Sequence, residues 1–216
     1  MPNIFFEINP IKNTGRLDRK NVIFVEGPDD ANFLDVLLEK VGASPDDVGV
    51  VTVGGKGNFP SQLNLFAKSP PFTRGTTKKV CIIRDADDNP SAEGVSTKSI
   101  FLKTFGAETA HGKLSAHNGI EFGFFIMPNS FEPGDLEKLC LSTVEGNEVS
   151  QKVERFFESL TNPPVDKTFK RKAQVYLAAQ NGNLARGAGQ GFKDGYFNAA
   201  SAKLDEIIKF LEIFVS

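Results

Sequence analysis

The sequence predicts an α/β protein with a parallel sheet of about four strands flanked by helices. Short, β-branched apolar runs recur along the chain as far as Met127, and such runs are typical of strands buried on both faces of a sheet. Segments with apolar residues at helical spacing separate these runs. Strands that alternate with helices imply βαβ crossovers, and therefore a parallel sheet.

The predicted strands end at turn residues, and the segments between them carry helix signals. Gly27-Pro28, followed by Asp29 and Asp30, predicts the start of a helix directly after the first strand. The predicted strands are Val22–Val25, Val48–Val53, Val80–Ile83 and Phe122–Met127. Further helices are predicted over 58–68, 96–105, 134–141 and 149–160, and loops over 69–77 and 106–119.

The last quarter of the chain is predicted to be mostly helical. Asn162-Pro163-Pro164 interrupts the pattern, and helices are expected over 167–180 and 199–215, with a Gly- and Asn-rich loop over 181–195 between them. The final helix has one apolar face, formed by Leu204, Ile207, Ile208, Leu211 and Phe214. We therefore divide the chain into an α/β core, 1–145, and a helical extension, 146–216, which we expect to pack on the sheet within one globule.

Composition narrows the class of protein. The chain has 216 residues, of which 40% are hydrophobic and 24% charged, as in ordinary soluble domains. No apolar stretch reaches the roughly 20 residues of a membrane span, and the N-terminus lacks the pattern of a signal peptide. Two cysteines imply neither a disulfide framework nor a structural zinc site. We expect a cytoplasmic protein without a membrane part.

Carboxylates follow two of the predicted strands where those strands end. Glu26 comes after the first strand, and Asp85 and Asp87 come after the third. The carboxyl ends of parallel strands meet at one edge of a sheet, where ligands bind in open α/β folds. Clustered carboxylates repel one another unless a counter-charge is present, and Mg²⁺ prefers such oxygen ligands. The pattern predicts a divalent-metal site.

Other acids nearby have simpler explanations. Asp29 lies where carboxylates favour the start of a helix, and Asp88 is typical of a turn. Asp30 fits either the helix start or the metal site. The Gly54-Gly55-Lys56-Gly57 segment lacks the spacing of a phosphate-binding P-loop and indicates a tight turn into a helix.

Three segments of the sequence resemble the Toprim signature. They read VIFVEGPDDANF, VTVGG and VCIIRDADDN, in that order. The resemblance implies a compact, roughly four-stranded parallel sheet and Mg²⁺ chemistry on phosphodiesters. Downstream, FIMPNSFEPGDLEKL and KRKAQVYLAAQNG are similar to segments of stand-alone bacterial Toprim-like proteins of unassigned function, which are related to the Toprim part of OLD-type (overcoming lysogenization defect) nucleases.

The resemblance also implies roles for individual residues. Glu26 matches a glutamate that acts as general acid/base or metal ligand, and Asp85 and Asp87 match a metal-binding pair. Asp30 and Glu137 match further acids of the OLD-type nucleases. Asn129 is a departure, because an aspartate is expected there. There is also no ATPase domain in this chain, and the resemblance leaves open both a protein partner such as an ATPase and the loss of any activity that depends on one.

A basic segment near the end of the chain indicates which partners the protein could bind. From Lys167 to Lys193 there are six basic residues and no acidic one, although the net charge of the chain is −2. Lys170, Arg171 and Lys172 either form a solvated helix face or contact phosphate groups of nucleic acid.

Two hypotheses about function follow. The first is a nuclease that uses Mg²⁺ or Mn²⁺ held by Glu26, Asp30, Asp85, Asp87 and Glu137 to act on DNA or RNA. The second is a non-catalytic metal-binding module that binds nucleic acid or a protein in a repair or phage-defence system. A receiver domain or a haloacid-dehalogenase-type phosphatase is disfavoured, because its paired acids follow the first strand rather than the third. The oligomeric state is left open.

Overall fold

A mostly parallel sheet between helices confirms the predicted α/β class, although the sheet has six strands in the described part of the chain rather than about four. The computed structural model describes residues 5–6, 18–129, 131–163, 167–182 and 184–216. In that part of the chain the strand order is β1-β3-β2-β4-β6-β5. The strands are β1 (Phe5–Phe6), β2 (Asn21–Val25), β3 (Val48–Thr52), β4 (Lys79–Asp85), β5 (Leu114–His117) and β6 (Ile120–Met127). Neighbouring strands are parallel except for β5, which runs antiparallel to β6.

The four predicted strands form the parallel centre of the sheet. Every residue of β2 and β3 is buried, as the continuous apolar runs require of strands covered on both faces. Ile23 of β2 pairs with Val50 on one side and Cys81 on the other. β2 and β4 therefore run side by side and finish at the same edge.

Two of the described strands, the two-residue β1 and the longer β5, were not predicted from the sequence. β5 lies inside the segment predicted as a loop over 106–119, so that prediction is wrong for residues 114–117. Asn118 and Gly119 both have positive φ, 50° and 78°, as in the tight turns of β-hairpins. β5 is only partly buried, which explains why its sequence lacks a clear apolar alternation.

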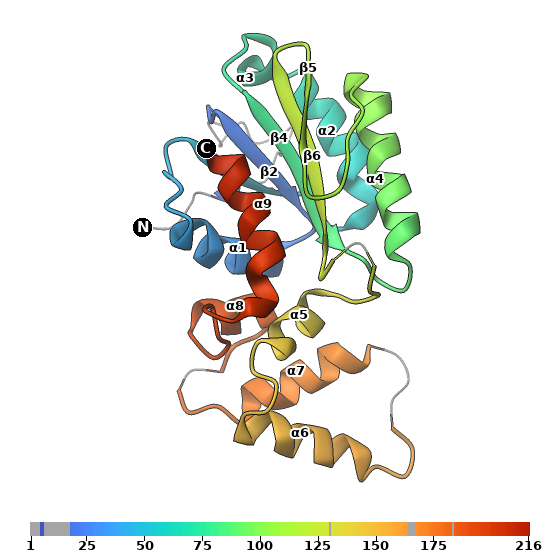
Figure 1. Ribbon diagram of the computed structural model, residues 1–216, viewed down its shortest axis with the longest axis vertical. Helices are drawn as coiled ribbons and strands as arrows, with labels where there is room; N and C mark the ends of the chain where they lie inside the picture. The colour runs from blue at the N-terminus through green and yellow to red at the C-terminus, as the bar shows by residue number, and fades with distance from the viewer. Residues whose placement is uncertain (1–4, 7–17, 130, 164–166, 183) are drawn as a thin grey trace.

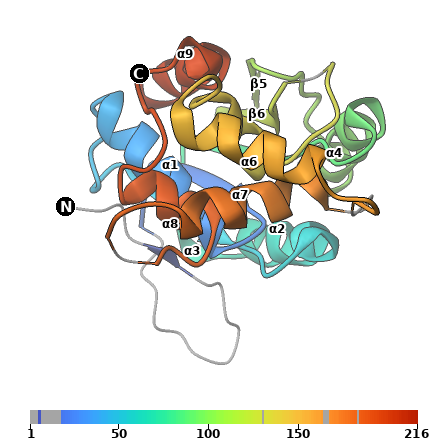
Figure 2. The same cartoon turned by 90° about the horizontal axis from the view of Figure 1, so that it is seen from below.

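Helices cover both faces of the sheet with separate cores (Figures 1 and 2). One core joins alternate strand residues such as Ile23 and Cys81 to α1 (Pro28–Lys40) and α9 (Asp205–Val215). The other joins Phe24 and Ile82 to α2 (Phe59–Ala67) and α4 (Pro90–Phe105). α3 (Pro70–Thr73) is a single turn within the predicted loop over 69–77.

Helix starts differ from the predictions where capping was overlooked. α4 begins at Pro90, six residues before the predicted 96, because the side chain of Asn89 accepts a hydrogen bond from the Ala92 amide at 3.0 Å. α9 begins at Asp205, after a short 3-10 helix over Ala202–Leu204. Another 3-10 turn, Lys56–Asn58, precedes α2.

The C-terminal helices lie largely at the carboxyl end of the parallel strands. α5 (Leu136–Ser142), α6 (Glu148–Glu158) and α7 (Thr168–Ala178) are beyond that edge in Figure 1. The short α8 (Ala188–Lys193) occupies part of the predicted loop over 181–195 and packs on α1. Residues of α6, α7, α8 and α9 belong to the same core cluster as β2 and β4. None of the helices in the described ranges is both long and apolar enough to cross a membrane.

Candidate functional site

The carboxyl ends of β2 and β4 bring acidic side chains to one edge of the sheet. Glu26 directly follows β2, and Asp85 is the last residue of β4. Phe24 and Ile82 are paired in the parallel register, so the two strands reach this edge together. The expected convergence of Glu26 and Asp85 is therefore present.

Asp85 lies among other carboxyl groups, and little in its surroundings compensates their negative charge. Its Oδ1 atom is buried and has no hydrogen-bond partner in the described part of the chain. Burial, together with the negative charges of Asp30, Glu26, Asp135 and Glu137, raises the pKa of Asp85 well above its usual value. These residues come from β4, α1, the end of β2 and α5, and together we call them the acidic cluster.

Asp30 lies at the helix start and also beside the other acids of this edge. Its Oδ2 accepts a hydrogen bond from the Gly27 amide at 2.9 Å, which satisfies the backbone N–H of the N-cap residue of α1. It is at the same time a member of the acidic cluster, next to Glu26 and Asp85. Burial raises the pKa of Asp30 to about 7, helped by the charges of Glu26 and Asp29 and opposed by the Gly27 hydrogen bond.

Arg84 is a buried cation that sequence reasoning missed. Its side chain is 1% exposed, and its Nη2 atom lies 2.7 Å from Glu93 Oε2. Its Nε atom is 3.9 Å from Glu26 Oε1, and its guanidinium lies 5.1 Å from the centre of the Phe59 ring. Burial raises the pKa of Glu26, and Arg84 partly offsets that rise. An arginine within an apolar strand was the available signal, since a buried charge needs a partner.

Asp87 is held by a lysine from the glycine-rich turn after β3. Asp87 has a positive φ of 47°, and its Oδ2 lies 2.5 Å from Lys56 Nζ. Lys56 also pairs with Glu93. Although burial opposes it, hydrogen bonds to both carboxylates raise the pKa of Lys56. The turn predicted at Gly54–Gly57 therefore supplies a cation to the acidic edge.

α5 contributes two acids, of which only Glu137 was predicted. Asp135 is the N-cap of α5 and accepts a hydrogen bond from the Lys138 amide at 2.8 Å. Glu137 is 12% exposed, and its Oε1 lies 3.7 Å from Lys170 Nζ. Burial raises the pKa of both carboxyl groups. An aspartate just before an apolar helical run was the signal for Asp135.

The acidic cluster has the right donor chemistry for a hard cation but is not arranged as a finished site. Among the residues that the structure describes, no group of three or more His, Cys, Asp or Glu side chains could hold a metal ion as placed. Even so, Asp85 Oδ1 and Glu26 Oε1 are buried oxygens that receive no hydrogen bond from any residue in the described ranges. Carboxylate oxygens of this kind are the ligands that Mg²⁺ and Mn²⁺ prefer, so the residues fit such an ion.

The side chains of Lys170, Arg171 and Lys172, the predicted phosphate contacts, have different neighbours. Lys170 reaches Glu137 of the acidic cluster. Lys172 instead pairs with Glu154 of α6 and lies 5.8 Å from the Phe157 ring centre. Arg171 is exposed on α7. Residues one or two apart do not share a helix face, so the three side chains do not form a single surface.

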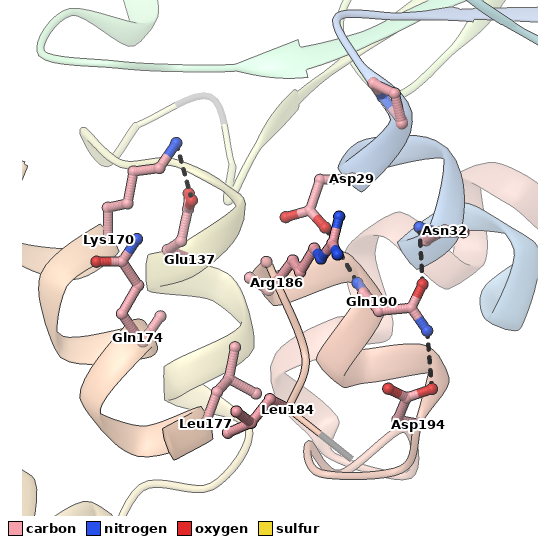
Figure 3. A pocket seen from close by; sticks show the side chains of 14 residues that line it. Asp29, Asn32, Glu137, Lys170, Gln174, Leu177, Leu184, Arg186, Gln190 and Asp194 are labelled. Atoms are coloured by element: carbon pink, nitrogen blue, oxygen red, sulfur yellow. Dashed lines mark hydrogen bonds and ion pairs between the residues drawn. The ribbon is translucent and has the colours of Figure 1, made fainter.

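Hollows open beside the acidic cluster. One, of about 810 Å³, is lined by Asp87 and Asp135 together with Lys56, Lys167 and Phe169. Another, of about 680 Å³, is lined by Asp29 and Glu137 and is drawn in Figure 3. Each is lined by one member of the acidic cluster, Asp135 in the first and Glu137 in the second.

The fold and this edge define an α/β protein with an acidic site at the carboxyl ends of its parallel strands. A family model described as "Protein of unknown function (DUF3226)" matches residues 20–216, and the chain belongs to that family. No curated protein and no solved structure matches the chain.

Proposed function

We propose that the protein is a Mg²⁺- or Mn²⁺-dependent phosphodiesterase, a nuclease acting on DNA or RNA through a Toprim-like acidic site. One observation carries the proposal. Asp85 has a buried oxygen that no described residue supplies with a hydrogen bond, and it is surrounded by the carboxyl groups of Glu26, Asp30, Asp135 and Glu137. Such an arrangement is costly unless the acids are protonated or a cation joins them.

The residues that would hold the ion are Glu26, Asp30, Asp85, Asp87 and Glu137. When bound, a divalent ion polarises the phosphate and lowers the pKa of its water. Glu26 is the group that we assign to proton transfer. Its pKa is raised by burial, and a carboxyl pKa nearer neutrality suits a general acid or base.

Lysines at the same edge would help to hold an anionic substrate. Lys56, paired with Asp87 and Glu93, lines the hollow of about 810 Å³. Lys170 lies beside Glu137, and Arg171 is its exposed neighbour on α7. Contacts of this kind to phosphate give affinity without reading sequence. Lys172, held by Glu154, is less available for that role.

A non-catalytic module is the second candidate. It is favoured by the ion pairs that Lys56 and Lys170 make with Asp87 and Glu137, because they neutralise two of the acids without a metal. In that case the cluster would bind an ion or a partner, such as nucleic acid or an ATPase, without hydrolysis.

Mn²⁺ titration followed by electron paramagnetic resonance, combined with cleavage of a labelled single-stranded oligonucleotide, tests the proposal. We expect the wild type to bind Mn²⁺ and to cleave. Asp85→Asn keeps the shape of the side chain and removes its charge, so the variant should lose both properties. Asp46→Asn is the matched control, because Asp46 lies exposed in the turn before β3.

Three outcomes are informative. Mn²⁺ binding without cleavage, abolished by Asp85→Asn, would favour the non-catalytic module. Cleavage that persists in Asp85→Asn would show that this site does not carry the reaction. Absence of Mn²⁺ binding to the wild type would refute the metal site itself.

A further inference from the structure

A groove next to the acidic cluster has the composition of a small-ligand site. Its volume of about 680 Å³ is within the range of roughly 300–1,000 Å³ typical of such sites. Asp29 of α1, Glu137 of α5, Gln174 of α7 and Gln190 of α8 line its walls (Figure 3). Glu137 belongs to both the groove and the acidic cluster, so a ligand in the groove lies beside the proposed reaction site.

Two polar side chains in the groove have no partner in the described ranges. Arg186 makes no hydrogen bond or ion pair there, and the amide of Gln174 makes no hydrogen bond. Their neighbours differ, since Gln190 is fixed by Asn32 at 3.3 Å and by Asp194 at 2.8 Å. Arg186 and Gln174 are therefore the groups that remain available to a ligand.

The remaining wall of the groove is apolar. Leu177 and Leu184 line it together with Ala173, and Leu184 is 78% exposed. A large exposed aliphatic side chain beside an unpaired guanidinium suits a ligand that has both a flat apolar part and an anionic part. The donors of Arg186 match phosphate oxygens, and the amide of Gln174 can both donate and accept hydrogen bonds.

We propose that this groove binds a nucleoside phosphate, with Arg186 on the phosphate and the base against Leu177 and Leu184 beside Gln174. The inference rests on the proposed function and narrows its substrate to a strand end or a free nucleotide. A base within a duplex is stacked on both faces, and extruding it costs a few kcal/mol. An unpaired terminal nucleotide reaches the apolar wall without that cost, while the phosphodiester next to it extends toward Glu137.

Calorimetric titration in EDTA tests binding separately from cleavage. The probe is a 5′-phosphorylated thymidine dinucleotide, compared with thymidine monophosphate and with a short blunt duplex. We expect the dinucleotide to bind and the duplex not to compete. Arg186→Gln removes a charged hydrogen bond and should weaken binding by about tenfold to a hundredfold.

Two further variants serve as a second test of the groove and as a control. Gln174→Glu preserves the size of the side chain but places a negative charge against the ligand, so it should also weaken binding. Arg74→Gln removes an exposed arginine beside α3, at the opposite end of the molecule from α8 (Figure 1), and should bind as the wild type does. Equal affinity for monophosphate and dinucleotide would identify a free nucleotide as the ligand, whereas tighter dinucleotide binding would identify a strand end.

The proposal about the groove and the proposal about the metal site can be refuted independently of each other. If Arg186→Gln and Gln174→Glu both bind the dinucleotide as the wild type does, or if the duplex competes equally, the groove inference is overturned even when Mn²⁺ binding and cleavage persist. If the variants weaken dinucleotide binding while the wild type binds no Mn²⁺, the groove stands and the metal-dependent function fails.

Discussion

Replacing Asp30 with asparagine should stabilise the metal-free protein at alkaline pH. Asp30 is 8% exposed, and burial raises its pKa from 3.8 to about 7. A carboxyl group whose folded pKa lies above its unfolded pKa binds more protons in the folded state between those values. The free energy of unfolding of the wild type should therefore fall as pH rises from about 3.8 to about 7.

The size of the effect follows from the same shift. At 1.36 kcal/mol for each pKa unit, a rise from 3.8 to about 7 corresponds to roughly 4 kcal/mol lost above pH 7. Asparagine cannot ionise, and its side-chain oxygen can still accept the hydrogen bond from the Gly27 amide. The variant should equal the wild type near pH 4 and exceed it by up to roughly 4 kcal/mol at pH 8.

Urea unfolding in EDTA, followed by circular dichroism at pH 4, 6 and 8, measures the difference directly. Asp47→Asn is the control, because Asp47 forms a surface pair with Lys20 at 2.7 Å and should change stability by less than about 1 kcal/mol at any pH. Parallel pH profiles for the wild type and Asp30→Asn, or a less stable Asp30→Asn protein at pH 8, would refute the reasoning.

Two further predictions concern the scaffold of the site. A Cβ on Gly189 would lie 1.8 Å from the carbonyl oxygen of Asp29, so Gly189→Ala should destabilise the protein by about 1–3 kcal/mol in thermal unfolding. The control Gly94→Ala has open space around its new Cβ and should stabilise the protein by about 0.5–1 kcal/mol. Equal effects of the two substitutions would contradict the close contact between α1 and α8. Arg84→Met leaves Glu26 and Glu93 without their buried cation and should cost about 3–5 kcal/mol in urea unfolding. Lys152→Met is the control, because it breaks only an exposed pair with Glu148 in the described part of the chain and should cost less than about 1 kcal/mol. A small loss for Arg84→Met would show that Glu93 does not depend on it.

The sheet was predictable because its strands are buried on both faces. Continuous apolar runs such as Val22–Val25 indicate that burial directly, and parallel order follows from the helices between them. Where burial is partial, as in β5, the pattern disappears and the strand was missed. The Asn118-Gly119 pair remained the only local signal of that hairpin in the sequence.

The acidic edge was predictable from chain order, but its counter-charges were not. Glu26 and Asp85 follow strands, and parallel strands finish together. Lys56 meets Asp87 across 31 residues, and Arg84 meets Glu93 from a neighbouring helix. Such contacts depend on how helices pack on the sheet, which no local spacing encodes.

Asp29 illustrates the same limit at a helix end. Its position indicated a role at the start of α1, where carboxylates favour the helix dipole. Its Oδ1 instead accepts a hydrogen bond from the Gln190 amide at 3.0 Å, at the start of α8. A partner 161 residues away could not be inferred from the sequence around Asp29, and neither could the groove that Asp29 lines.

The distribution of charge across the sheet supports the proposal that an added cation would bind at Asp85. Arg84 points to the α2 and α4 side, where it meets Glu93 and Phe59. Asp85, the next residue along β4, lies among the carboxyl groups of α1 and α5 and has no ion pair in the described part of the chain. Alternation along a strand sends adjacent side chains to opposite faces, so the buried cation cannot neutralise the acid beside it. The uncompensated charge therefore stays at the carboxyl edge, where only protonation or an added cation can relieve it.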